Sequence, residues 1–116
     1  TCEYNEKIYG NWPAAVEMGK TAGNNAVGDE VHFVSFVSSV IFAAMNCNLF
    51  SCGNFSEDFK NISSSDPSKG TYSKLFFENN KLVGGILIGD TSKSGKIMLA
   101  IQSEKTLNDV LKENTL

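Results

Sequence analysis

The chain has 116 residues, of which 41% are hydrophobic, and a formal net charge of -3; this length suits one domain with a single core. Its ten basic residues are all lysines and are scattered, whereas nucleic-acid binding needs a basic cluster, so we expect no nucleic-acid partner. No apolar run approaches the roughly 18 residues that a membrane-spanning helix needs, so we expect no membrane association.

Three cysteines, Cys2, Cys47 and Cys52, leave one thiol unpaired in any intramolecular disulfide scheme. An odd count without a secretory signal is typical of proteins of the reducing cytoplasm, where we expect this protein to reside. Cys47 and Cys52 have no second Cys or His pair that could complete a zinc site. The sequence therefore predicts buried structural thiols and no metal centre.

The first element predicted along the chain is a helix from Asn11 or Trp12 to Gly28. Asn11 is a good N-cap, Pro13 falls in the first turn, where its missing N–H costs nothing, and Gly28 is a natural stop. The residues that share its apolar face are mostly small: Trp12, Ala15, Val16, Gly19, Ala22, Gly23, Ala26 and Val27. Either a ligand or backbone comes close to this face, or the helix packs tightly on a strand without a ligand; the residues alone leave both readings open.

Residues 31–53 are apolar and rich in β-branched side chains. They predict two strands, residues 36–45 and 49–52, joined by a turn at 46–48, although a buried helix over 38–45 fits the same apolar content.

The next segment gives weaker signals. Residues 55–63 alternate aromatic and acidic side chains with polar ones and predict another strand, and residues 63–70 (SSSDPSKG) predict a turn-rich connection.

The strongest local signal is a hairpin of residues 71–78 and 81–89 around Asn79-Asn80, a pair that tolerates positive φ. The expected register sets Glu78 opposite Lys81, Phe77 opposite Leu82 and Phe76 opposite Val83. Gly84 and Gly85, expected across from Leu75 and Lys74, mark a bulge or a close approach to the backbone.

Two short helices are expected at the end of the chain. Ser92 or Ser94 caps the first, which buries an apolar face of Ile97, Ala100 and Ile101. Thr106 caps the second, with Asp109 near its positive end and an inward face of Leu107, Val110 and Leu111.

The residues do not form a catalytic centre, and we name no catalytic residue. The single histidine, His32, has no nucleophile spaced to it, and the carboxylates form no distinctive pair. There is no glycine-rich phosphate loop between a strand and a helix; the glycines of GGILIG lie inside a predicted strand.

Two stretches of the chain carry a family resemblance. Residues 2–29, CEYNEKIYGNWPAAVEMGKTAGNNAVGD, resemble the closing segment of the FAD domain in flavoprotein reductases with two dinucleotide-binding domains. The remainder, with NLFSCG and KLVGGILIGD, resembles their C-terminal α+β domain. The chain is thus similar to pyridine nucleotide-disulfide oxidoreductase-type reductases, in the branch of NADH:rubredoxin reductases, NADH oxidases and nitrite reductase large subunits.

The resemblance implies an α+β fold, an antiparallel sheet with a central hairpin and flanking short helices, preceded by the last helix of a truncated FAD-binding domain. Residues 1–30 would be the remnant of that domain, and residues 31–116 a C-terminal domain of the rubredoxin-binding or interface type. The N-terminus of the first helix would point at the isoalloxazine, with Asn11, Trp12 and Pro13 at the FAD edge of the intact parent. Both dinucleotide-binding regions would lie ahead of Thr1, so we expect no cofactor on this chain.

The function implied by the resemblance is that of a C-terminal fragment, inactive alone, of a reductase that passes electrons from NADH via FAD to rubredoxin or a similar small acceptor. Its partners would be that acceptor and the missing FAD and NAD domains. A homodimer is also expected, because the Ala/Gly helix face would otherwise be exposed. The alternatives are a stand-alone, non-catalytic dimerisation or interaction module and a reductase fragment whose acceptor is oxygen or nitrite.

Overall fold

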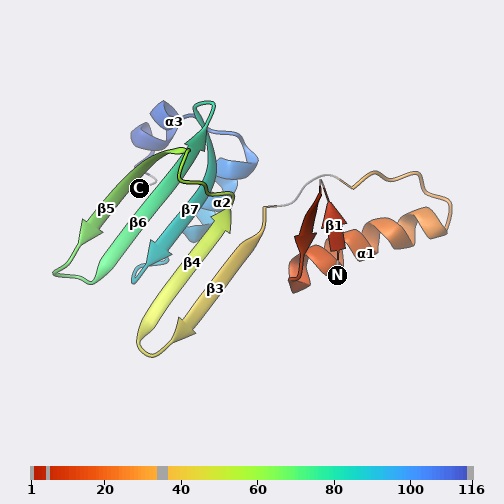
Figure 1. Ribbon diagram of the computed structural model, residues 1–116, viewed down its shortest axis with the longest axis horizontal. Coiled ribbons are helices and arrows are strands. Elements are labelled where there is room, and N and C mark those ends of the chain that lie inside the picture. The colour runs from red at the N-terminus through yellow and green to blue at the C-terminus, as the bar shows by residue number, and fades with distance from the viewer. Residues whose placement is uncertain (1, 5, 34–36, 115–116) are drawn as a thin grey trace. The chain divides into compact units, whose positions relative to one another are not determined.

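The structure, a computed structural model, describes residues 2–4, 6–33 and 37–114. The chain forms two compact units, which we call the N-terminal unit (residues 1–38) and the C-terminal unit (residues 39–116). Each unit has its own secondary structure (Figure 1).

The N-terminal unit combines a small hairpin with one helix. β1 (Cys2–Tyr4) pairs antiparallel with β2 (Lys7–Tyr9), and α1 (Trp12–Ala26) follows. The sequence predicted the helix and its N-cap but not the two short strands. The described part of α1 buries only Ala14 completely, while Tyr4 meets Phe33 edge to face with ring centroids 4.9 Å apart.

The C-terminal unit is an antiparallel sheet with two helices, which confirms the predicted α+β class. The described strands follow the order β3-β4-β7-β6-β5. Their bounds are β3 Ser39–Ala44, β4 Cys47–Gly53, β5 Lys60–Asp66, β6 Thr71–Glu78 and β7 Lys81–Ile88. α2 (Ser94–Gln102) and α3 (Leu107–Lys112) lie together on one face of this sheet (Figure 1).

The core of this unit lies between the sheet and the two helices. Its fully buried large side chains are Phe50, Cys52, Leu75, Phe77, Leu82, Ile97 and Val110. Residues directly opposite each other in an antiparallel ladder lie on the same face of the sheet. Phe50 is opposite Leu87 and Cys52 is opposite Gly85, so the core face of the sheet extends across β4 and β7.

The β6–β7 hairpin confirms the predicted turn and corrects the predicted register. Asn79 and Asn80 have φ values of 50° and 65°, and Glu78 opposes Lys81 as expected. A bulge between Phe76 and Phe77 then places Gly84 opposite Phe76, where Val83 had been expected. Gly84 is needed there because a Cβ on it would lie 2.0 Å from the Asn54 carbonyl oxygen.

Two strand predictions need correction. Residues 55–59 form no strand, and β5 covers Lys60–Asp66, which overlaps the end of the predicted strand (55–63) and continues into the segment predicted as a turn-rich connection (63–70). The serines of β5 pair with β6 through their backbone groups. An alternation of apolar and polar side chains in the sequence cannot predict such a strand. The predicted strand 36–45 is β3, which covers Ser39–Ala44 and turns at Met45-Asn46; Phe36 lies outside the described residues.

The helix ends agree only in part with the sequence. Neither Ser92 nor Ser94 caps α2; the N-cap is Lys93, without a side-chain cap bond. Thr106 caps α3 as predicted, but Leu111, expected inward, is 54% exposed. Of the six residues of α3, Val110 is the one that is fully buried.

Candidate functional site

The N-terminus of α1 brings together Asn11, Trp12 and Pro13, the residues predicted to face a cofactor. Asn11 has extended backbone geometry (φ -114°, ψ 155°), and its Oδ1 accepts a hydrogen bond of 3.2 Å from the Ala14 N–H. Its Nδ2 donates to Ser38 Oγ at 2.8 Å. One side chain therefore caps the helix and ties its start to the end of the same unit.

The helix start offers few free amide donors. Pro13 has no N–H, Ala14 donates to the cap, and Ala15 donates to the Asn11 carbonyl at 3.2 Å. Within the described residues, Trp12 is left as the one first-turn amide without an acceptor. This end of α1 thus keeps the positive end of the helix dipole without the cluster of N–H groups that holds a phosphate.

Trp12 lies on the surface of this chain rather than in its core. Its side chain is 80% exposed, whereas Ala14, two residues later, is 0% exposed. The helix therefore buries Ala14 and leaves Trp12 on the surface, and α1 contacts β1 of the hairpin. An exposed indole next to a positive helix end can lie against the edge of a flat aromatic ligand or against a protein partner.

The small-residue face of α1 is open in this chain. A Cβ on Gly19 or Gly23 would meet no heavy atom within 4 Å, and Ala15, Ala22 and Ala26 are exposed. The sequence left open what approaches this face, and the resemblance implied that the face would be exposed without its partner domain. In the described residues α1 buries Ala14, which lies on a neighbouring stripe of the helix, and not the glycines.

The chemistry of these residues is compatible with the edge of a flat ring such as the flavin that the resemblance implies, but the helix start lacks the amides that would hold its phosphates. Asn11 and Pro13 set the position of the helix start, Trp12 offers a flat apolar surface, and the helix dipole favours negative charge close to it. A bound flavin would supply hydride acceptance and single-electron transfer. The protein's own part would be to position the ring edge, shield it from water and favour its anionic form.

The other candidate residues of the sequence do not assemble into a site. His32 and Cys47 are exposed, and Cys52 is buried. Burial raises the pKa of the Cys52 thiol to about 11, and a backbone hydrogen bond with Gly85 opposes this only in part, so the thiol is neutral at physiological pH. Among the residues that the structure describes, no group of His, Cys, Asp and Glu could hold a metal ion.

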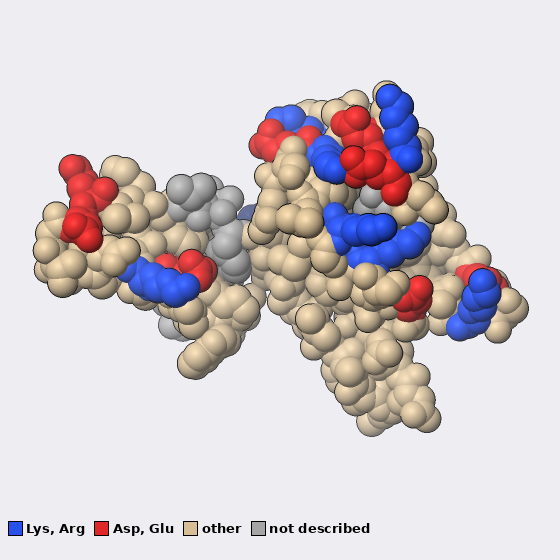
Figure 2. Space-filling model, turned by 180° about the vertical axis from the view of Figure 1, so that it is seen from behind, with Lys and Arg blue, Asp and Glu red and all other residues tan. Residues whose placement is uncertain are grey.

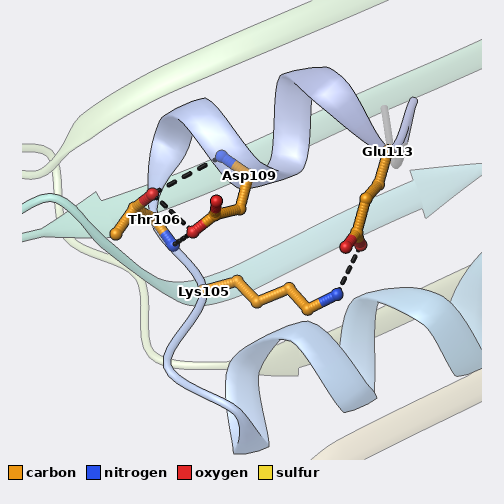
Figure 3. A network of polar contacts seen from close by, with 4 residues as sticks. All are labelled: Lys105, Thr106, Asp109 and Glu113. Atoms are coloured by element: carbon orange, nitrogen blue, oxygen red, sulfur yellow. Dashed lines mark hydrogen bonds and ion pairs between the residues drawn. The ribbon is translucent and has the colours of Figure 1, made fainter.

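A shallow hollow beside α2 and α3 had not been predicted. It has a volume of about 220 Å³ and is lined by Lys96, Leu99, Lys105 and Glu113. Figure 3 shows the Lys105 side chain lying between the two helices and pairing with Glu113. The helix face around it carries both signs of charge (Figure 2). An ion pair within the chain, such as that of Lys105 with Glu113, is typical of a solvent-exposed structural contact and not of a binding site.

The polar contacts at the start of α3 are likewise structural. Thr106 Oγ1 donates to Asp109 Oδ2 at 2.7 Å and accepts from the Asp109 N–H at 3.4 Å (Figure 3). The hydrogen bonds that the Thr106 hydroxyl and the Thr106 N–H donate to the Asp109 carboxylate hold the pKa of that carboxyl below its usual value.

None of the described helices is long and apolar enough to cross a membrane.

Comparison with known proteins assigns a family to the C-terminal unit. The family model described as Rubredoxin NAD+ reductase C-terminal domain matches residues 39–105, more than half of the chain. A nitrite reductase [NAD(P)H] of Bacillus subtilis is 28% identical over 117 residues, which cover 98% of this chain and 14% of the relative. An NADH-rubredoxin oxidoreductase of Clostridium acetobutylicum is 24% identical over 108 residues, which cover 90% of this chain and 28% of the relative.

Solved structures give the same result. The crystal structure of NADH:rubredoxin oxidoreductase from Clostridium acetobutylicum matches 96% of this chain and 31% of its own, with a TM-score of 0.68 and 26% identity. A NAD-dependent persulfide reductase of A. fulgidus matches 84% of this chain and 22% of its own, with a TM-score of 0.68; at 19% identity it shows the fold alone. The chain thus spans less than a third of the length of each of these relatives.

Proposed function

Because the chain belongs to the rubredoxin NAD+ reductase C-terminal domain family, we propose that it is the C-terminal part of an FAD-dependent NADH reductase. In the intact enzyme, electrons would pass from NADH through FAD to rubredoxin or a similar small acceptor. The observation that carries the proposal is the family match, which begins at Ser39, the first residue of the C-terminal unit. The likeness to an NADH-rubredoxin oxidoreductase over 90% of the chain supports it.

The N-terminal unit has its own place in this proposal. We assign residues 1–30 to the end of an FAD-binding domain and residues 31–116 to the acceptor-binding or interface domain. The family match does not reach the first unit, but the solved NADH:rubredoxin oxidoreductase aligns with 96% of the chain, which requires that most of this unit be included. Asn11, Trp12 and Pro13 would then lie at the flavin edge.

The chain by itself is proposed to be inactive. It offers one wall for a flavin ring, whereas much of the affinity for a dinucleotide comes from a phosphate-binding glycine loop, and the sequence contains none. Titration of FAD or NADH against the purified chain should therefore show no saturable binding at micromolar concentrations. A stoichiometric flavin absorption spectrum on the purified chain would overturn this part of the proposal.

A second acceptor is favoured by a specific observation. The nitrite reductase of Bacillus subtilis aligns with 98% of the chain at a higher identity than the rubredoxin reductase does. The same C-terminal domain could therefore serve a reductase whose final acceptor is nitrite.

The experiment that tests the proposal uses the intact protein that contains this chain. Purified after expression with its upstream sequence, it should carry FAD, and NADH should reduce that FAD in stopped-flow absorbance. Rubredoxin, nitrite and oxygen are then offered in turn as oxidants of the reduced flavin. Rapid reoxidation by rubredoxin supports the first acceptor and rapid reoxidation by nitrite the second. A flavin-free protein would leave the stand-alone interaction module as the explanation.

A further inference from the structure

α1 is held in place by little packing. In the described part of the N-terminal unit it buries only Ala14 completely, and a Cβ on Gly19 or Gly23 would meet nothing within 4 Å. α1 has 15 residues, and isolated helices shorter than about 12–15 residues are marginal in water. Polar contacts at the two ends of this helix therefore matter for where it lies.

The chain that follows α1 is bonded to both ends of the helix. In the last turn, the Asn25 side chain donates to the Val31 carbonyl at 2.7 Å and accepts from the Val31 N–H at 3.3 Å. At the first turn, Asn11 Nδ2 donates to Ser38 Oγ at 2.8 Å. Ser38 is thus the residue that meets the end of α1 where Trp12 lies.

Asn11 uses both atoms of its amide group. Its Oδ1 accepts from the Ala14 N–H, which fixes the oxygen on the helix side and turns the nitrogen toward Ser38. Asn11 and Ser38 are both half-buried, so water competes less for their hydrogen bond. Trp12 follows directly, and Pro13 restricts the backbone on its other side, so holding the Asn11 side chain also limits the movement of the indole.

We propose that Ser38 is a positioning residue for the flavin edge. By accepting the Asn11 amide hydrogen, it fixes the start of α1 and with it the Trp12 indole. The inference rests on the proposed function, which supplies the flavin that this end of the helix would face. The positive end of a helix dipole stabilises nearby negative charge only within about one turn, so the position of the helix start sets how strongly the anionic reduced flavin is favoured.

Substitution of Ser38 in this chain tests the position of the helix start without a flavin. In Ser38→Ala, exchange of the Ala14 amide should accelerate by about two- to tenfold, which is the effect of one lost neutral hydrogen bond on a local opening equilibrium. Time-resolved fluorescence anisotropy of Trp12, the one tryptophan of the chain, should show faster local motion. Ser38→Thr keeps the hydroxyl and should restore both wild-type values.

Ser39→Ala is the matched control. Ser39 is the next residue in the chain and begins β3, and its hydroxyl makes no hydrogen bond to a described residue, so this variant should match the wild type in both measurements. The Ile97 amide of α2, bonded to the Lys93 carbonyl at 3.1 Å, is the internal reference and should not change. Unchanged Ala14 exchange in Ser38→Ala, or an equal change in Ser39→Ala, would overturn the proposal.

A second variant shows whether the two side chains act as a pair. Asn11→Ser keeps a capping oxygen, but its shorter side chain cannot reach Ser38 as well. It should accelerate Ala14 exchange about as much as Ser38→Ala does, and the double variant should exchange no faster, because both changes remove the same hydrogen bond. Accelerations that multiply in the double variant would show two independent effects and refute the pairing.

In the intact reductase the readout is the reduction potential of the flavin. Ser38→Ala should make it more negative at equal FAD content, because the positive helix end is held less firmly beside the anionic reduced ring. Ser38→Thr should restore the wild-type potential, and Ser39→Ala should leave it unchanged. An unchanged potential in a Ser38→Ala variant whose Ala14 exchange has accelerated would overturn the link to the flavin. An intact protein without FAD would refute the proposed function and that link together, while the exchange data on this chain still decide whether Ser38 holds the start of α1.

Discussion

Gly85 of β7 lies directly beneath Ile97 of α2: a Cβ placed on Gly85 would come within 2.8 Å of Ile97 Cγ2. Leu75 Cδ2, at 3.2 Å from the same position, would crowd it as well, and both neighbouring side chains are fully buried. The missing side chain at Gly85 is therefore what allows α2 to rest on the centre of the sheet.

Gly85→Ala should reduce the free energy of unfolding by about 1–3 kcal/mol, because the added methyl group overpacks a core that has no free space. Urea unfolding followed by circular dichroism measures it. Gly95→Ala is the matched control: a Cβ there meets nothing within 4 Å, and alanine is the better helix former by about 1 kcal/mol, so stability should hold or rise. Equal free energies of unfolding for the two variants would contradict the packing of Gly85 against Ile97 and Leu75.

Trp12→Ala should change the stability of this chain by no more than about 0.5 kcal/mol, because the side chain is 80% exposed. A buried tryptophan would cost about 3–5 kcal/mol. In the intact reductase we expect the same change to slow acceptor reduction while NADH still reduces the flavin, as stopped-flow traces of the two half-reactions would show. Ala14→Leu is the contrast, since Ala14 is fully buried and overpacking there should destabilise the N-terminal unit.

Thr106→Ala should cost about 0.5–2 kcal/mol of stability, because Thr106 caps α3. It should also change the acid limb of the stability profile. The pKa of Asp109 is lower in the folded protein, so its contribution is present above the unfolded value of 3.8 and is lost as pH falls through the lower, folded value. Thermal melts between pH 2 and pH 7 should show a smaller acid loss in the variant; parallel profiles would argue against the Thr106–Asp109 link.

Cys47 and Cys52 should differ in reactivity. Cys47 is exposed and should be alkylated by iodoacetamide at pH 8 in the folded chain, while Cys52 is buried and should react only after unfolding. Peptide mapping by mass spectrometry resolves the two sites. Because folding raises the pKa of Cys52 from 9.0 to about 11, its contribution to stability is complete below pH 9 and is lost as pH rises toward 11. Cys52→Ala should remove that alkaline loss.

Several elements follow from the sequence because their signals lie within a few residues of one another. Asn79-Asn80 supplies two residues that accept positive φ, and the hairpin turn forms where they stand. Asn11 ahead of Pro13 starts α1, and Thr106 with Asp109 three residues later starts α3. The resemblance to the flavoprotein reductases is of the same kind, since it rests on short stretches that can be read without knowing what lies beside them.

The tertiary structure decided what depends on residues far apart in the chain. The serines of β5 give no strand pattern and become a strand because β6 offers its free edge. The register shifts between Phe76 and Phe77, next to Val83, whose carbonyl accepts a hydrogen bond from the Asn54 N–H outside the hairpin. Trp12 and Ile41 are both apolar and both exposed, since burial depends on which segment lies next to a side chain and not on the side chain itself. For that reason the sequence alone could place Trp12 beside a flavin only by resemblance, and it could not indicate that the apolar side chains of β3 are exposed.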